Sequence, residues 1–543
     1  MNKLHKTAFK GLSGFGVAAL IMLSQTSCTD RFLDYNTNEH QATDEMMQWD
    51  NLSTGSYFVQ MQKNVFVVEQ LPSIGADAYQ TSQNLAGDVY SGYMGACGTW
   101  NGGNNSTTYN LGLDWNGTAF ERAFAGVMPA WNAITKKAKE NQQPQVEALA
   151  TIVKVEAMHR TTDLYGPLPY LSFGNGNVKN NYDGQKEIYN AFFQELTQAI
   201  NTLTDFNQKD PAAKVLENYD FIFAGNVANW IKFANTLKLR LAMRIVYADP
   251  AKAQAMAEEA VNHSVGVITA ASEAVKLNHT EKLTYRHPLY VIGQGEFNDV
   301  RMGATIDSYM NGYSDPRLGS YFKLSTGGKY TGIRNGINII REKYAEKAPF
   351  SDLNINASSD LVWMNPAESY FLRAEGALRG WNMGATAQAL YEQGVRTSFA
   401  FSGASGVDAY LQNDTAVPMA YTDPSTSGNS IAAGDPLLGT ITIKWADADN
   451  FERKLERIIT QKWLAIFPDG QEAWSEFRRT GYPKVLPVKV NNSGGKINTQ
   501  RQIRRMQFPN TEYRDNREAV EQAATLLGGE DNGGTPLWWD KKN

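Results

Sequence analysis

The chain has 543 residues, a formal net charge of −5 and 20% charged residues. It shows no basic stripe, which argues against nucleic acid as a partner. Its length exceeds the usual single-domain range, yet no Pro-, Ser- or Gly-rich linker divides it, so we expect one compact body with insertions.

The first predicted element is a targeting segment. Lys3, Lys6 and Lys10 give the chain a basic start, and a short apolar run follows over residues 11–23. This run is too short to span a bilayer comfortably, and nothing later approaches the ~18 apolar residues of a transmembrane helix. We therefore predict a secretory signal. Its removal takes away three positive charges, so that −5 becomes about −8.

The signal ends at one of the two cysteines. The small residues Thr26 and Ser27 lead into Cys28, as in a bacterial lipoprotein processing site, although Gln25 stands where such sites usually carry Leu. We predict a signal peptide over 1–27 and an acylated Cys28. Lipid chains hold a protein on a membrane at roughly 0.8 kcal/mol per buried methylene. The alternative is an ordinary signal peptide cut nearby, with Cys28 incidental.

An acylated Cys28 leaves Cys97, the other cysteine, without a partner. No disulfide framework then exists, and stability must come from an ordinary hydrophobic core.

Helical periodicity dominates the rest of the chain. Apolar residues recur at spacings of three and four in three stretches: 145–158, 187–203 and 455–466. This spacing places one apolar face of a helix against a neighbour.

The stretch "NPAESYFLRAEGALRG" predicts the first helix of a hairpin. Asn365 is the expected N-cap, Pro366 the first helical residue, Glu368 the partner that closes a capping box, and Gly380 the C-terminal stop. A second helix is expected over about 385–399. The pair spans ~35 residues, the size of a tetratricopeptide unit, although the consensus letters of that repeat are absent.

A second hairpin is predicted near the C-terminal end. Asp449 and Glu452 are the expected capping box, 468–470 the turn, and 472–478 the second helix. Helix pairs of this kind stack into a curved scaffold.

The predicted fold class is therefore all-α, with tetratricopeptide-like helix pairs and a loop-rich, irregular second subdomain. The mature chain, 28–543, is expected to form a single body. Its helices are predicted at about 41–264, 366–400 and 450–480, and its loop-rich insertions at about 75–115, 265–360 and 403–440. Loops of this length are usually functional or disordered.

The sequence contains no recognisable catalytic motif. No two of its six histidines lie at i, i+4, no HExxH occurs, and neither a GxSxG elbow nor a GxxxxGK[ST] phosphate loop is present. Glu368 and Glu375 have structural interpretations, as a cap and as an ion-pair partner. We predict a protein that is not an enzyme, with no cofactor and no metal. A surface glycoside hydrolase stays open as an alternative, because sequence cannot place two carboxylates at the required distance.

Aromatic residues in the first long loop are the candidate ligand contacts. They are Tyr90, Tyr93, Trp100, Tyr109 and Trp115. An aromatic face stacks on a sugar ring while amides bond its hydroxyls, and the same rings also grip peptides. Trp100, next to Asn101, fits this description best. The alternative is burial of the loop against the scaffold.

The sequence resembles the SusD/RagB family of outer-membrane nutrient-binding lipoproteins, particularly its SusD-like second branch. The matching stretches, in family order, are "CTDRFLDYNTN", "NLAGDVYSGYM", "TDLYGPLPY", "YDGQKEIYNAFFQEL", "ANWIKFANTLKLRLAMRI", "MGATIDSYMNGYSDPRL", "AESYFLRAEGALRGW" and "ERIITQKWLAIFPDGQEAWSEFRRTGYP".

This resemblance implies a helical tetratricopeptide-like body. It also implies a lipid anchor at Cys28 and display on the outer face of the outer membrane. The implied partner is a SusC-like TonB-dependent β-barrel transporter, over which the protein sits as a lid. The implied role is capture of a nutrient without chemistry.

The resemblance leaves the cargo open between an oligosaccharide or polysaccharide and an oligopeptide. In glycan-binding members, the loop after the first helices contributes stacking aromatics, and Trp100 and Tyr109 fall there. A second wall is expected from the stretch around Tyr285, Tyr290 and Tyr313. The motifs that hold Tyr90, Tyr93 and Tyr313 are themselves shared by the family, so shared architecture is the alternative for these residues. The charges of Arg240 and Arg244 are expected to pair internally.

Overall fold

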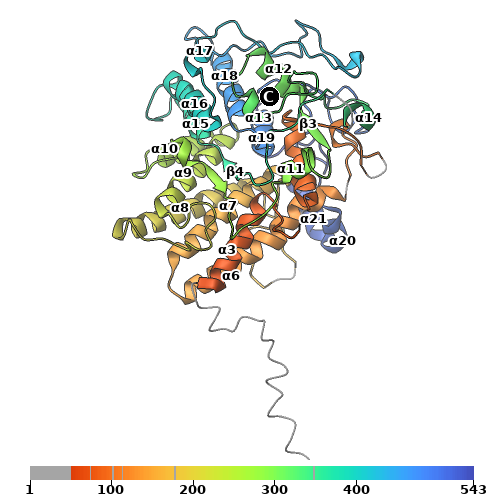
Figure 1. Ribbon diagram of the computed structural model, residues 1–543. Coiled ribbons are helices and arrows are strands. Elements are labelled where there is room, and N and C mark those ends of the chain that lie inside the picture. Colours follow the sequence, from red (N-terminus) through yellow and green to blue (C-terminus); the bar gives the residue numbers. More distant parts are fainter. Residues whose placement is uncertain are drawn as a thin grey trace, which may run out of the picture. The chain divides into compact units, whose positions relative to one another are not determined.

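The computed structural model describes residues 51–542 except 74, 101–102, 113, 177–178 and 346–348. The chain divides into two units, Met1–Ser53 and Thr54–Asn543, and the fold described below is that of the second unit (Figure 1). The predicted signal peptide and Cys28 lie outside the described residues. No helix within the described residues is both long enough and apolar enough to cross a membrane.

The second unit is built mainly from α-helices. Its helices in the first half are α3 Leu52–Val65, α4 Asp77–Tyr79, α5 Thr118–Arg122, α6 Met128–Glu140, α7 Pro144–Tyr165, α8 Gln185–Lys209, α9 Val227–Arg244 and α10 Pro250–Val261. The later helices are α11 Pro288–Gly293, α12 Ala304–Gly312, α13 Leu318–Tyr321, α14 Arg341–Tyr344, α15 Ala367–Leu378, α16 Ala387–Ser402, α17 Val407–Leu411, α18 Phe451–Ala465, α19 Gly470–Thr480, α20 Asn510–Asp515 and α21 Arg517–Leu526.

Consecutive helices stack side by side from α6 to α10 (Figure 1). Helix α15 packs against α9, α16 and α18, which carries the stack into the C-terminal half. The helices expected from apolar periodicity are present as α7, α8 and α18. Their apolar residues join one large core, in which Leu149, Phe192 and Trp463 are buried. The predicted all-α class with paired helices is confirmed.

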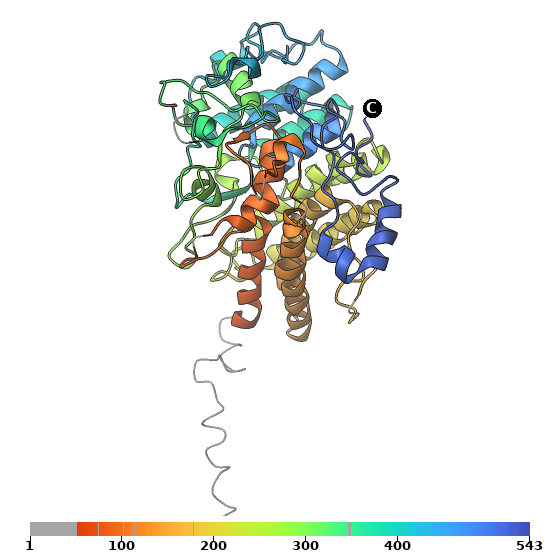
Figure 2. The ribbon, with the colours of Figure 1, turned by 90° about the vertical axis from the view of Figure 1, so that its right-hand side faces the viewer.

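Strands contribute little to the described part of the fold. Strand β1 (Met94–Ala96) pairs antiparallel with β3 (Val300–Met302), and β2 (Val275–Leu277) pairs antiparallel with β4 (Leu361–Met364). The first pair matters most for function, because β1 leads directly into the loop that carries the candidate ligand residues. Figure 2 shows this N-terminal part against the C-terminal segments of the chain.

The predicted helix caps are partly wrong. Helix α18 is capped by Asn450, whose Oδ1 accepts from the Arg453 amide at 2.9 Å, and not by Asp449. Asn365 does accept the Ala367 amide at 3.0 Å, but Glu368 is drawn away to other partners. The physical reason is competition: a carboxylate buried beside a guanidinium gains more from that ion pair than from a capping bond.

The beginning of the first long loop is helical. Helix α4 runs directly into a π-helix over Gln80–Asp88, inside the predicted loop segment 75–115. Its buried side chains are mostly polar, so no apolar periodicity marks it in the sequence. Gln80 Nε2 donates to Asp299 Oδ2 at 2.7 Å, whereas Gln83 Nε2 and Asn84 Oδ1 have no hydrogen-bond partner among the described residues.

A buried ionic network ties α7, α9, α15, α18 and α19 together. Arg240 on α9 donates through Nε and Nη2 to the carboxylate of Glu368 at 2.8 and 2.6 Å. Its other members are Glu156, Asp163, Arg244, Glu375, Lys462, Glu472, Glu476 and Arg479. The predictions of internal pairing for Arg240 and Arg244 and of an ion pair at Glu375 are confirmed.

Acid should weaken this network at Glu476. Burial by itself would raise the pKa of that carboxyl, but Arg479, Lys462 and Arg244 outweigh burial and hold the pKa at about 2. A folded-state pKa below the unfolded value stabilises the fold above about pH 4.5, and this contribution is lost as the pH falls toward 2. We expect the Tm to fall across that window and the slope to be shallower in Glu476→Gln, measured by calorimetry at a series of pH values.

The π-helix is pressed against the start of α19. A Cβ added at Gly87 would lie 2.6 Å from the backbone N and Cα of Gln471, and one at Gly470 would lie 2.4 Å from Cα of Asp88. Two backbones approach this closely only where glycine leaves the space free.

Replacing Gly87 with alanine should therefore cost about 2 kcal/mol, because the helices must move apart to relieve the overlap. The expected result is a lower midpoint in urea unfolding. Gly327→Ala is the matched control, since a Cβ there meets only ordinary contacts at 3.7 Å or more. Equal midpoints for the two variants would contradict the tight approach.

Candidate functional site

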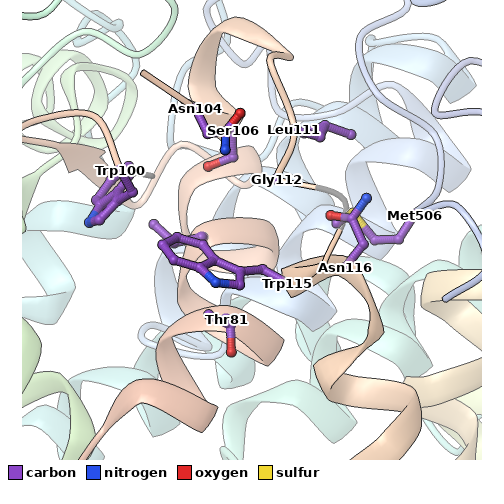
Figure 3. Close-up of a pocket in the computed structure, with 10 residues that line it drawn as sticks. Thr81, Trp100, Asn104, Ser106, Leu111, Gly112, Trp115, Asn116 and Met506 are labelled. Atoms are coloured by element: carbon purple, nitrogen blue, oxygen red, sulfur yellow. The ribbon is translucent and has the colours of Figure 1, made fainter. Parts of the chain in front are cut away.

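The candidate site is built on the loop that follows β1. Trp100 begins a tight reversal in which its amide donates to the Asn104 carbonyl at 2.9 Å and the Asn104 amide donates back at 2.7 Å. Gly103 has φ +105°, a conformation that favours glycine. The reversal presents the half-buried Trp100 indole at the surface of the body (Figure 3).

A carboxylate fixes the Trp100 ring in place. The indole Nε1 donates to Asp299 Oδ2 at 3.3 Å, and the same oxygen accepts from Gln80. Arg341 Nη1 bonds the other oxygen, Oδ1, at 2.7 Å, and Arg341 Nη2 bonds the Phe297 carbonyl at 2.9 Å. Because three elements hold Asp299, the ring is positioned before any ligand arrives, which lowers the entropy cost of binding.

A shallow hollow with about 30 Å³ of free space lies beside this ring, so a sugar would lie across it rather than inside it. Ten residues line it: Thr81, Leu85, Trp100, Asn104, Ser106, Leu111, Gly112, Trp115, Asn116 and Met506. Figure 3 shows Trp100 at the left of the hollow, Trp115 below its centre, and Asn116 and Met506 opposite Trp100. Two aromatic rings, amides and hydroxyls at one small hollow are the groups that bind a sugar or a peptide.

The polar groups of the hollow include an unpartnered amide. Asn116 is buried, and its backbone carbonyl accepts a hydrogen bond from the Tyr165 hydroxyl, which fixes its position. Its side-chain Nδ2 has no hydrogen-bond partner within the described protein. A buried amide without a partner is a costly arrangement that a ligand or an ordered water relieves.

Three predicted tyrosines of the loop region do not face a ligand. Tyr90, Tyr93 and Tyr109 are 6%, 0% and 4% exposed. The Tyr93 hydroxyl donates to the Trp463 carbonyl, and the ring of Tyr90 lies 5.1 Å from that of Trp474. Burial raises the pKa of each of the three phenols. Their prediction as stacking residues is corrected: the rings are part of the core.

Two of the three tyrosines expected at the second wall are also interior, and the third, Tyr290, is half-buried. Tyr285 and Tyr313 are 1% and 2% exposed, and their hydroxyls donate to the carbonyls of Leu277 at 2.7 Å and Ile441 at 2.9 Å. Both tyrosines lack an exposed ring face, so the structure does not bring them to the Trp100 hollow. Asn101 lies outside the described residues.

Several residues of the site carried no sequence signal. Met506 reaches the hollow from the far end of the chain, and Leu85 comes from the π-helix that the sequence pattern does not reveal. Asp299 and Arg341 hold the Trp100 ring through contacts between residues far apart in the sequence. Trp100 and Trp115, aromatic residues in one polar loop, were the lining residues that the sequence did indicate.

The described residues contain no group of three or more His, Cys, Asp or Glu side chains arranged to hold a metal ion. Cys97 is a free, buried cysteine close to the site, and burial raises the pKa of its thiol to about 12. A thiol that stays protonated is a poor nucleophile, so Cys97 has a packing role here.

Asp299→Ala should weaken ligand binding about tenfold without unfolding the protein. The substitution removes the acceptor of the Trp100 indole and releases Arg341, so the ring must be ordered again on binding. Titration calorimetry measures the affinity, and the indole N–H signal of Trp100 in ¹⁵N NMR reports the lost bond. Asp299→Asn, which keeps an acceptor oxygen, should recover most of the affinity. An unchanged Trp100 signal in Asp299→Ala would contradict the positioning role.

The sequence as a whole matches a known family. A family model described as "SusD-like: Susd and RagB outer membrane lipoprotein" matches residues 34–540. The chain belongs to this family. Its members are outer-membrane lipoproteins, and the tetratricopeptide-like helix stack of this SusD-like protein agrees with that assignment. A comparison with curated proteins found no match.

Solved structures of SusD homologues superimpose over nearly their whole length. A chitin-binding SusD homologue from Flavobacterium johnsoniae is 41% identical, with a TM-score of 0.84 over 90% of this chain and 98% of its own. A SusD homologue from Bacteroides uniformis ATCC 8492 is 39% identical, with a TM-score of 0.82, 90% and 99% coverage. One from Bacteroides thetaiotaomicron VPI-5482 is 37% identical, with a TM-score of 0.81, 90% and 99% coverage. The SusD-like fold of this protein is thus shared across its body.

Proposed function

We propose that this SusD-like protein captures an oligosaccharide at the hollow beside Trp100 and delivers it unchanged. The observation that carries the proposal is the pair of indoles, Trp100 and Trp115, at one small hollow whose other polar groups are amides and hydroxyls. Such a set stacks on the apolar face of a pyranose ring and bonds its rim. The chitin-binding homologue at 41% identity supports a glycan and makes β-linked N-acetylglucosamine oligomers the first candidates.

We further propose that Cys28 carries the lipid anchor, that the protein faces the cell exterior, and that it serves as the lid of a SusC-like TonB-dependent transporter. Capture requires only that the ligand binds and that the lid has an open and a closed position, of which the ligand favours the closed one. Micromolar affinity, about −8 kcal/mol, would suit a cargo that must later leave. No catalytic step belongs to this proposal.

An oligopeptide is the second candidate cargo, because the same rings also grip peptide side chains and the amides also bond peptide backbone. Isothermal titration calorimetry of the purified chain against a panel of oligosaccharides and a panel of peptide digests separates the two. Heat from a glycan, without turnover of that glycan, supports the proposal. If only peptides give heat, the cargo is an oligopeptide rather than a glycan. If the protein turns over any oligomer, its function is hydrolysis rather than binding.

A further inference from the structure

The loop that carries the site has an unusual composition. Between Asp88 and Asp114 lie 25 residues, 89–113, without a single Asp, Glu, Lys, Arg or His. Since 20% of the chain is charged, about five ionisable residues would be expected in a stretch of this length. The stretch is also rich in Asn, Gly, Ser and Thr, so it is polar without being charged.

The residues that line the hollow are likewise uncharged. All ten residues that line it are uncharged, including those that come from outside the loop, Thr81, Leu85, Trp115, Asn116 and Met506. A charged ligand group that leaves water for such a wall finds no counter-ion. Burial of an unpaired charge costs far more than burial of a hydroxyl or amide that is hydrogen-bonded.

Two carboxylates beside the hollow have partners within the protein. Asp299 lies behind the Trp100 ring and is paired with Arg341 at 2.7 Å. Asp114, the neighbour of Trp115 in the sequence, is exposed, and its Oδ1 accepts from Asn510 at 3.2 Å. Asp299 is therefore not free to pair with a cationic sugar, and Asp114 is not among the residues that line the hollow.

The two arginines before Met506 are likewise held inside the protein. Arg504 is paired with Asp540 at 2.7 Å, and Arg505 is paired with Asp531 and donates to the Tyr165 carbonyl. Both side chains are buried, at 6% and 0% exposure, so they do not present a guanidinium to an anionic sugar.

We infer that the site selects uncharged sugar units and rejects acidic and cationic ones. This inference rests on the proposed capture of a glycan at Trp100 and deepens it by naming the class of cargo: neutral pyranose oligomers, with or without acetamido groups. Uronic-acid oligomers and protonated amino-sugar oligomers are excluded by the cost of placing their charges against an uncharged wall.

The test uses the full chain and four pentasaccharides in titration calorimetry. Chitopentaose and cellopentaose are neutral, the fully deacetylated chitosan pentamer is cationic below the pKa of its amines, and pentagalacturonate is anionic. We expect at least one neutral ligand to bind, and the galacturonate to bind at least tenfold more weakly. The chitosan pentamer should gain at least tenfold in affinity when the pH rises above its amine pKa, while the neutral ligands change less than threefold.

A charge placed in the wall should reverse the selection. Asn104→Asp keeps the shape of the side chain and adds a carboxylate at the hollow, so the affinity for the protonated chitosan pentamer relative to that for cellopentaose should rise at least tenfold. Asn262→Asp is the matched control on the exposed C-terminal end of α10, and it should change neither affinity. The pH comparison on the natural chain stands even where the Asn104 variant fails to fold.

The outcomes separate this inference from the proposed function. Charged oligomers that bind as tightly as neutral ones, with binding lost in Trp100→Ala, would overturn the selectivity and leave glycan capture standing. If no member of the panel binds, the selectivity fails together with the proposed capture of these glycans. If only peptides bind, both the selectivity and the proposed capture of glycans fail.

Discussion

Replacing Trp100 with alanine should lower the affinity for the glycan by about 30- to 150-fold, a loss of about 2–3 kcal/mol, in titration calorimetry. The substitution removes the ring that offers its face to the hollow and that Asp299 already holds in position. A preorganised aromatic residue at the centre of a small site contributes more than its area suggests, because its ordering is already complete in the free protein.

Two further variants serve as a comparison and a control for the Trp100→Ala prediction. Trp115→Ala should lose less, about tenfold, because Asp299 fixes the indole of Trp100, whereas the described residues hold no such acceptor for the indole of Trp115. Trp445→Ala, a half-buried tryptophan that bonds Asp447 away from the hollow, should leave the affinity unchanged. A Trp100→Ala protein that still binds within threefold of the natural chain would exclude this hollow as the ligand site.

Arg240→Met should destabilise the protein by about 3–5 kcal/mol. Methionine keeps much of the length of the side chain but leaves Glu368 and Glu156, both 0% exposed, without their guanidinium. Removal of one partner of a buried ion pair is costly because the remaining charge stays in a region of low polarity. With an unfolding entropy of about 1 kcal/mol per degree for a body of this size, the Tm should fall by about 4 °C.

The control for this prediction is an exposed pair of the same kind. Arg396 bonds Asp408 at 2.7 Å with side chains that are 40% and 83% exposed, so Arg396→Met should change stability by less than about 0.5 kcal/mol. Adding Glu368→Gln to Arg240→Met should restore part of the loss, since the uncompensated carboxylate is then gone. A loss no larger than that of Arg396→Met would show that the network is not a source of stability.

Helices with a regular apolar stripe were predictable because their pattern reflects their own geometry. Helices α7, α8 and α18 show the spacing of three and four that places one face in the core. The π-helix Gln80–Asp88 was missed for the opposite reason. Its buried residues are mostly polar, and it is held by packing against α19 and by bonds to residues far along the chain, such as that from Gln80 to Asp299.

Aromatic residues in the loop correctly indicated where the hollow lies, but they did not indicate which rings are exposed. Trp100 and Trp115 reach the hollow, whereas Tyr90, Tyr93 and Tyr109 from the same segment fill the core. A phenol and an indole look alike in a sequence pattern. Which of them faces solvent depends on what the scaffold helices leave uncovered.

Composition and periodicity alone determined that this chain is a helical body with a polar, uncharged loop near its beginning, because these features depend on neighbours in the chain. Its membership of the SusD-like family was also readable from the order of its motifs. Only the folded structure decided which aromatic rings face a ligand, which carboxylates form the buried ionic network, and that Met506 and Asn116 meet at one hollow. Contacts between residues separated by hundreds of positions leave no local pattern, since the energy that creates them appears only when the helices pack.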